Sequence, residues 1–393
     1  MLGRMNRSRD DKVGTRHPRG QGKSPKRRQY APPSSQEQRD KSSSLAVRHG
    51  KRALATQRDF SDRFLIQFNS GLGELVERSL AIDLGPARID YRDGSALVIR
   101  LETSPDKVAS LPYVRNTFVV LGEVPEDNPA RAADRAAKTF DTFLSAPKSM
   151  MTIPHFRVMA QHAGQLVSIP APSRARLEQA ITRIDGGMVQ ARGSGREYWL
   201  IGRRNSESTI LAMKIPKAKT KRKPAAGEIA PELAALLARA SRPASHDVVL
   251  DPFAGTGSLL RARAALPHSQ LIANDLHRTI SHPEASIRLL RQDGRELSAI
   301  KDGSIDAVIT DPPWGEFDEI DEPMDLFVDH SVATIRRVLH PYHGRAVLMI
   351  ARQIERIWVA SLESHELEVT SITGILVNGH PASVITAHPH SSR

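Results

Sequence analysis

Two acidic residues, each at the end of a short apolar run, have the surroundings that a ligand site requires. Asp251 follows Val248–Leu250 and stands before the glycines Gly255 and Gly257. Glycine permits positive φ angles and leaves no Cβ in the way of a ligand. The segment therefore predicts a strand, a tight turn and a helix, the unit that binds a ligand at the carboxyl end of a strand in an open α/β sheet.

The acid at this turn disfavours a phosphate ligand. Most glycine turns of this kind hold phosphates, but a carboxylate would repel a pyrophosphate. In addition, Leu260 stands where the G-x-G-x-x-G pattern has its third glycine. The segment suits a cationic or hydroxyl-bearing ligand better. Taken alone, it is also compatible with an ordinary glycine-containing turn between a strand and a helix.

The second acid belongs to the sequence Asp311-Pro312-Pro313-Trp314, which follows the apolar run Ala307–Ile309. Proline lacks an N–H, so two prolines mark a rigid exit from a strand. The Asp311 carboxylate and the Pro312 carbonyl would then be fixed acceptors beside an indole ring. Such a set suits a flat group with an amino donor. The alternative is a Pro-Pro turn with a packed Trp.

Together the two segments resemble S-adenosylmethionine-dependent methyltransferases. VVLDPFAGTG (248–257) is similar to their first motif, and DPPW (311–314) is similar to the D/N-P-P-[YFW] motif of enzymes that methylate exocyclic amines of nucleobases. Trp314 stands where Tyr or Phe is more usual. The resemblance implies S-adenosyl-L-methionine as the cofactor, whose ammonium and sulfonium charges suit an acid at the strand end.

The resemblance also implies roles for individual residues. Asp275 would bind the ribose of the cofactor, and it lies 24 residues after Asp251, close to the roughly 20-residue offset of the ribose-binding acid in nucleotide-binding α/β folds. Asp293 would bind the adenine amine, with a surface Asp-Gly turn as the alternative. The expected cofactor residues are Asp251, Phe253, Ala254, Gly255, Gly257, Asp275, Leu276, Asp293 and Gly294, and the expected catalytic residues are Asp311, Pro312, Pro313 and Trp314.

The residues before the catalytic segment resemble the front half of THUMP-domain RNA methyltransferases. The similar stretches are FLIQFNSGLGELVERSL (64–80), FRVMAQHAGQLVSI (156–169) and GEIAPELAALLARAS (227–241). In that family a ferredoxin-like segment and a THUMP domain precede the catalytic domain. We therefore expect a ferredoxin-like α+β domain at 59–145 and a THUMP-like RNA-binding domain at 146–216. A Rossmann-like class I methyltransferase domain, α/β with a seven-stranded and mostly parallel sheet, would follow at 227–393.

The periodicity of apolar residues predicts the individual elements. In the front half we expect strands at 64–68, 87–91, 96–101, 114–120, 156–161, 165–169, 197–202 and 207–215, and helices at 71–82, 130–144 and 174–184. After the glycine turn we expect strands at 271–274, 346–350, 367–370 and 383–386, and helices at 285–290, 324–339 and 353–362.

The basic residues are unevenly distributed. Residues 1–58 contain 16 Lys and Arg against 4 Asp and Glu, and the remaining 335 residues carry 40 of each, so the net charge of +12 lies in this tail. Its low apolar content is typical of disorder. The tail would attract a polyanion, with a solvated tail or a mis-assigned start as alternatives. A second basic segment, at 217–226, is expected to link the two halves.

The composition limits the classes of protein and the kinds of site that the chain could have. The chain has no cysteine, which excludes disulfides and thiolate metal sites and favours a reducing cytoplasm. No apolar run approaches the roughly 18 residues of a membrane span, and the start lacks the apolar core of a signal peptide. His380, His388 and His390 are expected in or near a loop-like tail, without an acid or Cys to complete a metal set. We expect a cytoplasmic protein with no metal and no membrane partner.

The resemblance to THUMP-domain RNA methyltransferases implies methyl transfer from S-adenosylmethionine to the N2 amine of a guanosine in tRNA. The same DPPW chemistry would serve adenine N6 or cytosine N4 in DNA, which is the alternative. The interval between the two motifs is too short for a separate DNA-recognition domain, which favours RNA. A non-catalytic RNA-binding protein that kept the fold is a third hypothesis, and the intact acids Asp251, Asp275 and Asp311 argue against it.

Overall fold

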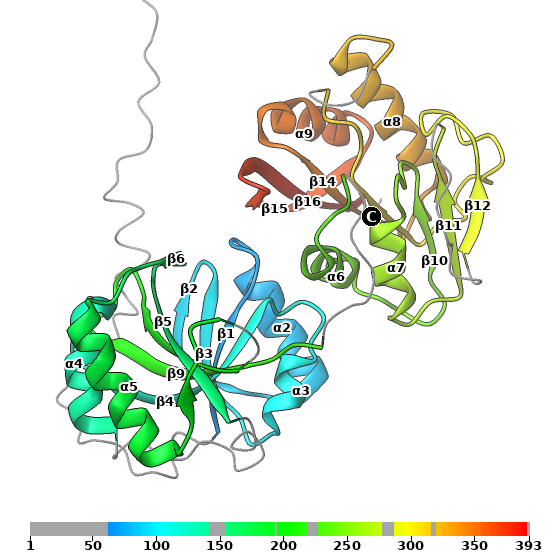
Figure 1. The fold of residues 1–393 in the computed structure, drawn as a ribbon. Helices are drawn as coiled ribbons and strands as arrows, with labels where there is room; N and C mark the ends of the chain where they lie inside the picture. Colours follow the sequence, from blue (N-terminus) through cyan, green and yellow to red (C-terminus); the bar gives the residue numbers. More distant parts are fainter. Residues whose placement is uncertain are drawn as a thin grey trace, which may run out of the picture. The chain divides into compact units, whose positions relative to one another are not determined.

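The computed structural model describes residues 62–140, 154–192, 195–218, 227–276, 287–315 and 320–390. The expected basic tail (1–58) and residues 219–226 of the expected linker lie outside these ranges. The described strands form a nine-stranded sheet within residues 63–215 and a seven-stranded sheet within residues 248–389 (Figure 1). Within these ranges no helix combines the length and the apolar character that crossing a membrane requires.

The nine-stranded sheet has the order β2-β3-β1-β4-β9-β8-β5-β6, and β7 pairs with β5. Its strands are β1 (Arg63–Gln67), β2 (Arg88–Asp93), β3 (Ala96–Arg100), β4 (Asn116–Val124), β5 (His155–His162), β6 (Gln165–Leu166), β7 (Met188–Val189), β8 (Arg196–Gly202) and β9 (Thr209–Ile215). Its helices are α2 (Gly73–Leu84), α3 (Pro105–Ala109), α4 (Pro129–Thr139) and α5 (Ala171–Asp185). Because β4 pairs with β9, strands from the expected segments 59–145 and 146–216 share one sheet.

Successive side chains along each strand point to opposite faces of this sheet, so each face has its own set of residues. Phe64 and Ile66 of β1 belong to the core that includes α2 to α5. Leu65, between them, lies on the opposite face in a smaller cluster with Phe118 and Trp199. The rings of Phe118 and Trp199 meet edge to face at 5.8 Å. The expected α+β architecture of the front half is confirmed.

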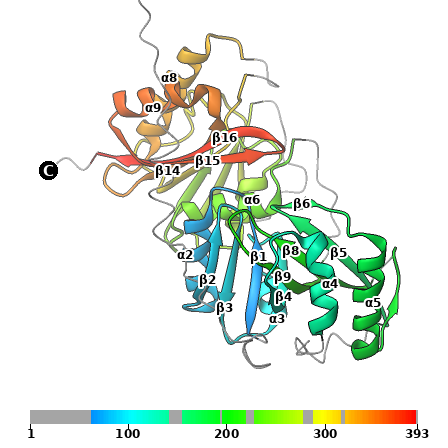
Figure 2. The ribbon, with the colours of Figure 1, turned by 90° about the vertical axis from the view of Figure 1, so that its left-hand side faces the viewer.

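The seven-stranded sheet has the order β12-β11-β10-β13-β14-β16-β15. Neighbouring strands from β12 to β14 in this order are parallel, and β16 runs antiparallel to both β14 and β15. Figure 2 shows β14, β16 and β15 side by side. Its strands are β10 (Val248–Asp251), β11 (Gln270–Asn274), β12 (Ile287–Leu290), β13 (Ala307–Thr310), β14 (Arg345–Ala351), β15 (Leu367–Val377) and β16 (His380–Pro389). This arrangement confirms the expected Rossmann-like sheet.

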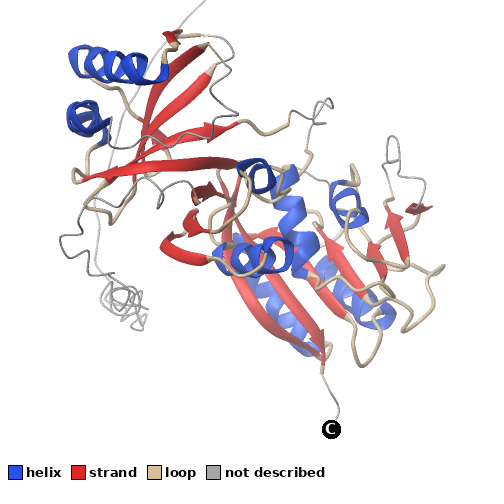
Figure 3. Ribbon diagram, turned by 90° about the horizontal axis from the view of Figure 1, so that it is seen from below, coloured by secondary structure: helices blue, strands red, loops and turns tan. Residues whose placement is uncertain are grey.

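Helices cover both faces of the seven-stranded sheet (Figure 3, helices blue and strands red). The helices are α6 (Pro231–Ala240), α7 (Ser258–Ala264), α8 (Met324–Val338) and α9 (Glu355–Ser364), with a 3₁₀ turn at Arg352–Ile354. Val249 of β10 belongs to the core of α6 and α7, and its neighbour Leu250 belongs to the core of α8 and α9. Since β11 and β13 flank β10, the strand order reverses at β10, where open α/β sheets bind ligands.

Two expectations for this sheet are wrong. The helix expected at 285–290 is absent over its described residues, because Ile287–Leu290 forms the edge strand β12, with Ile287 opposite Leu271 of β11. Ile287–Leu290 is short and has three apolar residues around Arg288, and so short a segment cannot distinguish a strand from a helix by periodicity alone. The closing hairpin is also longer than expected, so that His380 and His388 lie within β16 instead of a loop.

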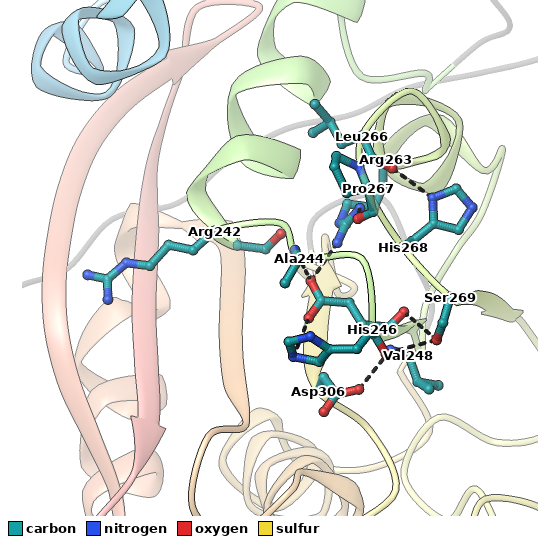
Figure 4. Close-up of polar contacts among 12 residues, drawn as sticks. Arg242, Ala244, His246, Val248, Arg263, Leu266, Pro267, His268, Ser269 and Asp306 are labelled. Carbon is teal, nitrogen blue, oxygen red and sulfur yellow. Dashed lines mark hydrogen bonds and ion pairs between the residues drawn. The ribbon is translucent and has the colours of Figure 1, made fainter. Parts of the chain in front are cut away.

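A buried ion cluster stabilises the amino end of β10 (Figure 4). Asp247 is fully buried, and its Oδ2 accepts hydrogen bonds from Arg263, at 2.7 Å, from Arg345, and from the Ala244 N–H, at 2.8 Å. Burial alone would raise the pKa of Asp247, but the bonds from Arg345 and Ala244 and the charges of both arginines hold it below its usual value. Asp247 is therefore the counter-charge of Arg263, which is itself fully buried.

Replacing Asp247 by Ala should lower the free energy of unfolding by about 3–5 kcal/mol, because Arg263 would stay buried without its counter-charge. Urea unfolding measures this loss. Asp302→Ala is the matched control, since Asp302 pairs with Arg337 but its side chain is 73% exposed. Its loss should be about 0–1 kcal/mol. Equal losses in the two variants would contradict the assignment of the cluster as a buried ion pair.

Candidate active site

The glycine turn after β10 has the geometry that its sequence predicts. Gly255 and Gly257 have φ angles of 50° and 76°, in the left-handed region that favours glycine. The Gly257 N–H donates to the Ala254 carbonyl at 2.7 Å, which closes the turn, and α7 begins at the next residue. The Ala254 N–H donates to the carbonyl of Asn274 at 2.8 Å. The turn is therefore hydrogen-bonded to the end of β11.

Asp251 is a buried acid at the point where the strand order reverses. It is 1% exposed, and its Oδ1 accepts hydrogen bonds from the Thr310 hydroxyl, at 2.7 Å, and from the Phe253 N–H, at 3.2 Å. Burial raises the pKa of Asp251 to about 7, against the lowering effect of these two bonds, and the charge of Asp275 adds to the rise. Because Thr310 ends β13, the bond also links β10 to β13.

Asp275 and Asn274 join the loops that follow three neighbouring strands. Asp275 Oδ2 accepts from the Gly255 N–H at 2.8 Å. The side-chain amide of Asn274, which is fully buried, donates to the carbonyls of Pro252, at 3.0 Å, and Gln292, at 2.9 Å. Its oxygen accepts from the Gln292 N–H at 2.9 Å. One buried side chain at the end of β11 thus holds the loops after β10 and β12.

The loop after β12 carries two of the expected cofactor residues. Asp293 accepts four hydrogen bonds from Arg295, at 2.8 Å from its backbone N–H and at 2.9, 3.0 and 2.6 Å from its guanidinium. A Cβ on Gly294 would lie 2.5 Å from the Phe253 ring and 2.9 Å from the Pro252 carbonyl. Glycine at 294 therefore allows this loop to approach the glycine turn. The Asp293 carboxylate is engaged by Arg295.

The DPPW segment directly follows β13 and has no regular secondary structure. The indole Nε1–H of Trp314 donates to Asp311 Oδ1 at 2.9 Å. Pro312 is buried, whereas Asp311 and Trp314 are partly exposed. The ring thus lies beside the carboxylate, as the sequence predicts, and the bond fixes both groups. This bond uses the indole N–H of Trp. Phe has no polar donor on its ring, and the hydroxyl of Tyr lies at the far tip of its ring.

The structure brings the expected residues together to different degrees. The hydrogen-bonded set around the turn includes Asp251, Ala254, Gly255 and Asp275. Phe253 lies against Gly294, whereas Leu276 is 40% exposed. Three positioning residues were missed by the sequence analysis, namely Asn274, Thr310 and Arg295. A usable signal existed for the first two, since each is a polar residue that ends an apolar run directly before an expected site acid.

A metal centre finds no support in the described part of the chain. No group of three or more His, Cys, Asp or Glu side chains in those residues is arranged to hold a metal ion. The polar atoms of the site are instead carboxylates, amides, a hydroxyl and backbone groups at the carboxyl ends of β10 to β13. Such a set can bind hydroxyls, amines and cations through hydrogen bonds and charge.

Comparisons with known proteins identify the fold. No protein-family model and no curated protein matches the sequence. Among solved structures, TrmN from Thermus thermophilus aligns with a TM-score of 0.63 and 21% identity, over 84% of this chain and 100% of that one. SMU.472, described as a candidate methyltransferase and solved with SAH, aligns with a TM-score of 0.59 and 12% identity, over 84% and 99%.

A predicted N6-adenine-specific DNA methylase from Listeria monocytogenes aligns with a TM-score of 0.58 and 14% identity, over 85% of this chain and 98% of that one. An alignment of only one half of this chain could not cover 84–85% of it. This protein therefore has the fold of these structures over both sheets, with a Rossmann-like sheet after an α+β region.

The raised pKa of Asp251 predicts a pH-dependent stability. The folded-state pKa of about 7 exceeds the roughly 3.9 of an unfolded chain, so the folded protein keeps this proton to higher pH and loses stability as pH rises through about 4 to 7. Asp251→Asn lacks this titration. Between pH 4.5 and 8, the unfolding free energy of the variant relative to wild type should rise by on the order of 3 kcal/mol.

Urea unfolding of both proteins at pH 4.5, 6 and 8 measures this difference. Titrations that the two proteins share cancel in the comparison. A difference that stays constant over this range would show that Asp251 titrates normally.

Proposed function

We propose that this protein is an S-adenosylmethionine-dependent methyltransferase that acts on an exocyclic base amine, N2 of a guanosine in tRNA. One observation carries the proposal. The 2.7 Å bond from Thr310 to Asp251 joins the glycine turn of β10 to the strand whose next residues are Asp311 and Pro312. This bond supports a proposed cofactor site and a proposed amine site that adjoin at the reversal of strand order.

The cofactor is proposed to bind at the carboxyl ends of β10, β11 and β12. Asp251 fits a cationic ligand, because a positive charge beside a buried carboxyl favours its ionised form and offsets the raised pKa. Asp275 is the proposed ribose ligand and, through its bond to Gly255, also shapes the turn. The adenine would lie by the loop of Asp293 and Gly294, where the Asp293 carboxylate would accept from the amine while Arg295 holds it in place.

The target amine is proposed to bind at Asp311 and Pro312. Its two N–H groups would donate to the Asp311 carboxylate and the Pro312 carbonyl, which aims the nitrogen lone pair and stabilises the positive charge that develops on it. S-adenosylmethionine supplies an electrophilic methyl group when bound. Alignment can provide much of the rate of such an in-line displacement, so no general base is needed during transfer. The proton leaves the more acidic, methylated amine afterwards.

Trp314 is the proposed stacking partner of the target base. A base inside a duplex or a stacked stem must leave its stack before it can reach such a pocket. The bond from Trp314 Nε1 to Asp311 holds the ring and the carboxylate in place before a base arrives. The ring would therefore bind the face of the base while the carboxylate binds its edge.

RNA is proposed as the substrate because of the front half of the chain. Its sequence resembles that of THUMP-domain RNA methyltransferases, and its nine-stranded α+β sheet precedes the catalytic sheet. A DNA substrate is the second candidate, since the predicted DNA methylase from Listeria monocytogenes aligns over both parts of this chain. The two candidates differ in the polymer that accepts the methyl group.

Transfer of label from radiolabelled S-adenosylmethionine tests the function. With unmodified total tRNA and duplex DNA as parallel substrates, the wild-type chain should label tRNA, and digestion should yield N2-methylguanosine. Asp311→Ala should reduce the rate at least about 100-fold, because it removes the acceptor that stabilises the developing charge. Asp325→Ala, which changes an exposed acid at the start of α8, is the matched control and should keep the rate.

The other outcomes decide between the alternatives. Label on DNA and not on tRNA would assign the protein to the DNA enzymes. Cofactor binding without transfer to either polymer would support the non-catalytic RNA-binding hypothesis. An Asp311→Ala variant as active as wild type would remove Asp311 from the mechanism.

A further inference from the structure

A cavity of about 270 Å³ lies beside Trp314. It is lined by Trp314, Ala351, Arg352, Gln353, His380 and Pro381. These residues follow β13, end or follow β14, and begin β16. In the strand order these elements lie on the far side of β13 from β11 and β12. The cavity is smaller than the sites of drug-sized ligands and suits a single ring system.

Arg352 is the charged side chain of this cavity, and its neighbours hold it in one orientation. Its Nη1 donates to Glu355 Oε2 at 2.7 Å and to the Ser383 hydroxyl at 3.0 Å. Its Nη2 lies 2.9 Å from the place where a Cβ on Gly374 would stand, so the guanidinium lies against the backbone of β15. Glycine at 374 is what leaves room for it.

Arg352, Glu355 and Arg356 form a charged group at the start of α9. Burial alone would raise the pKa of Glu355, but hydrogen bonds from Ser383 and Arg352, and the charges of Arg352 and Arg356, hold it below its usual value. Glu355 is therefore ionised, and two guanidinium groups face one carboxylate. The Arg352 side chain is 50% exposed, and both bonds described above use Nη1. A fixed guanidinium that reaches solvent is suited to an oxyanion, above all to a phosphate.

We propose that Arg352 binds a backbone phosphate of the RNA next to the target nucleotide, whose base enters the cavity beside Trp314. This inference rests on the proposed function and adds the group that positions the RNA. Phosphate contacts determine the register of a protein on a nucleic acid, whereas base contacts determine which base is read. Arg352 is thus a binding residue that sets which nucleotide reaches Asp311.

The carboxylate of S-adenosylmethionine is the competing anion for Arg352. The proposed cofactor residues follow β10, β11 and β12, and β13 separates β10 from β14 in the sheet. Arg352 follows β14 and shares its cavity with Trp314 and with His380 of β16. The position of Arg352 therefore favours an RNA phosphate over the cofactor carboxylate as its ligand. The affinity of an Arg352 variant for the cofactor distinguishes the two anions.

Binding of tRNA to the full chain, measured with SAH present at several salt concentrations, tests the inference. Arg352→Ala should weaken tRNA binding about 10- to 100-fold. It should also reduce the slope of log affinity against log salt by about one, because one phosphate contact is lost. Arg352→Lys should keep the slope and lose only part of the affinity. The affinity for S-adenosylmethionine, measured by calorimetry, should be unchanged.

Two further variants make the test specific. Gly374→Ala should also weaken tRNA binding, because its Cβ would displace the Arg352 guanidinium from its fixed position without removing it. Arg242→Ala is the matched control, since Arg242 is an exposed arginine in the loop before β10, at the amino end of the sheet. It should leave both the affinity and the slope as in wild type.

Three results would overturn the inference. The first is an unchanged tRNA affinity and slope in Arg352→Ala while wild type methylates tRNA, which leaves the proposed function intact. The second is an equal loss in Arg242→Ala. The third is a loss of cofactor affinity in Arg352→Ala, which would assign the residue to the cofactor. If wild type modifies no RNA, the proposed function fails and this inference fails with it.

Discussion

The hydrogen bonds of the Asn274 side chain are the interaction on which the site depends. This amide is fully buried at the end of β11, and it binds backbone groups of Pro252 and Gln292, in the loops after β10 and β12. Buried backbone groups that lose a partner are costly, so the three loops keep one arrangement only while this amide is present. The contact of Phe253 with Gly294 depends on the same arrangement.

A second hydrogen bond connects β10, whose following loop is a proposed cofactor-binding loop, to β13, which precedes the proposed catalytic residues. The Thr310 hydroxyl binds Asp251, and the next residue, Asp311, binds the indole of Trp314. Both acids lie at the carboxyl ends of neighbouring parallel strands, which the pairing of β10 with β13 brings together. The fold therefore places a buried acid of raised pKa and a partly exposed acid near each other, and this difference in surroundings supports the different roles proposed for them.

Much of this structure could be predicted from the sequence where local pattern determines it. The glycine turn, the Pro-Pro exit after β13 and the amphipathic helices follow from backbone limits and periodicity. The edge strand β12 could not, because its pairing with β11 decides its conformation. The roles of Asn274 and Arg352 could not either, since Asn274 depends on Gln292, 18 residues away in the chain, and Arg352 depends on Ser383, 31 residues away.

The affinity of Asn274→Ala for S-adenosylmethionine, measured by titration calorimetry beside wild type, tests the central claim most directly. The claim is that one buried amide holds the loops after β10, β11 and β12 in the geometry that binds the cofactor. It predicts at least about tenfold weaker binding in the variant, because backbone groups of Pro252 and Gln292 lose their partner. The far-UV circular dichroism should stay that of a folded protein. Equal affinity in a folded variant, or no binding by wild type, would contradict the claim.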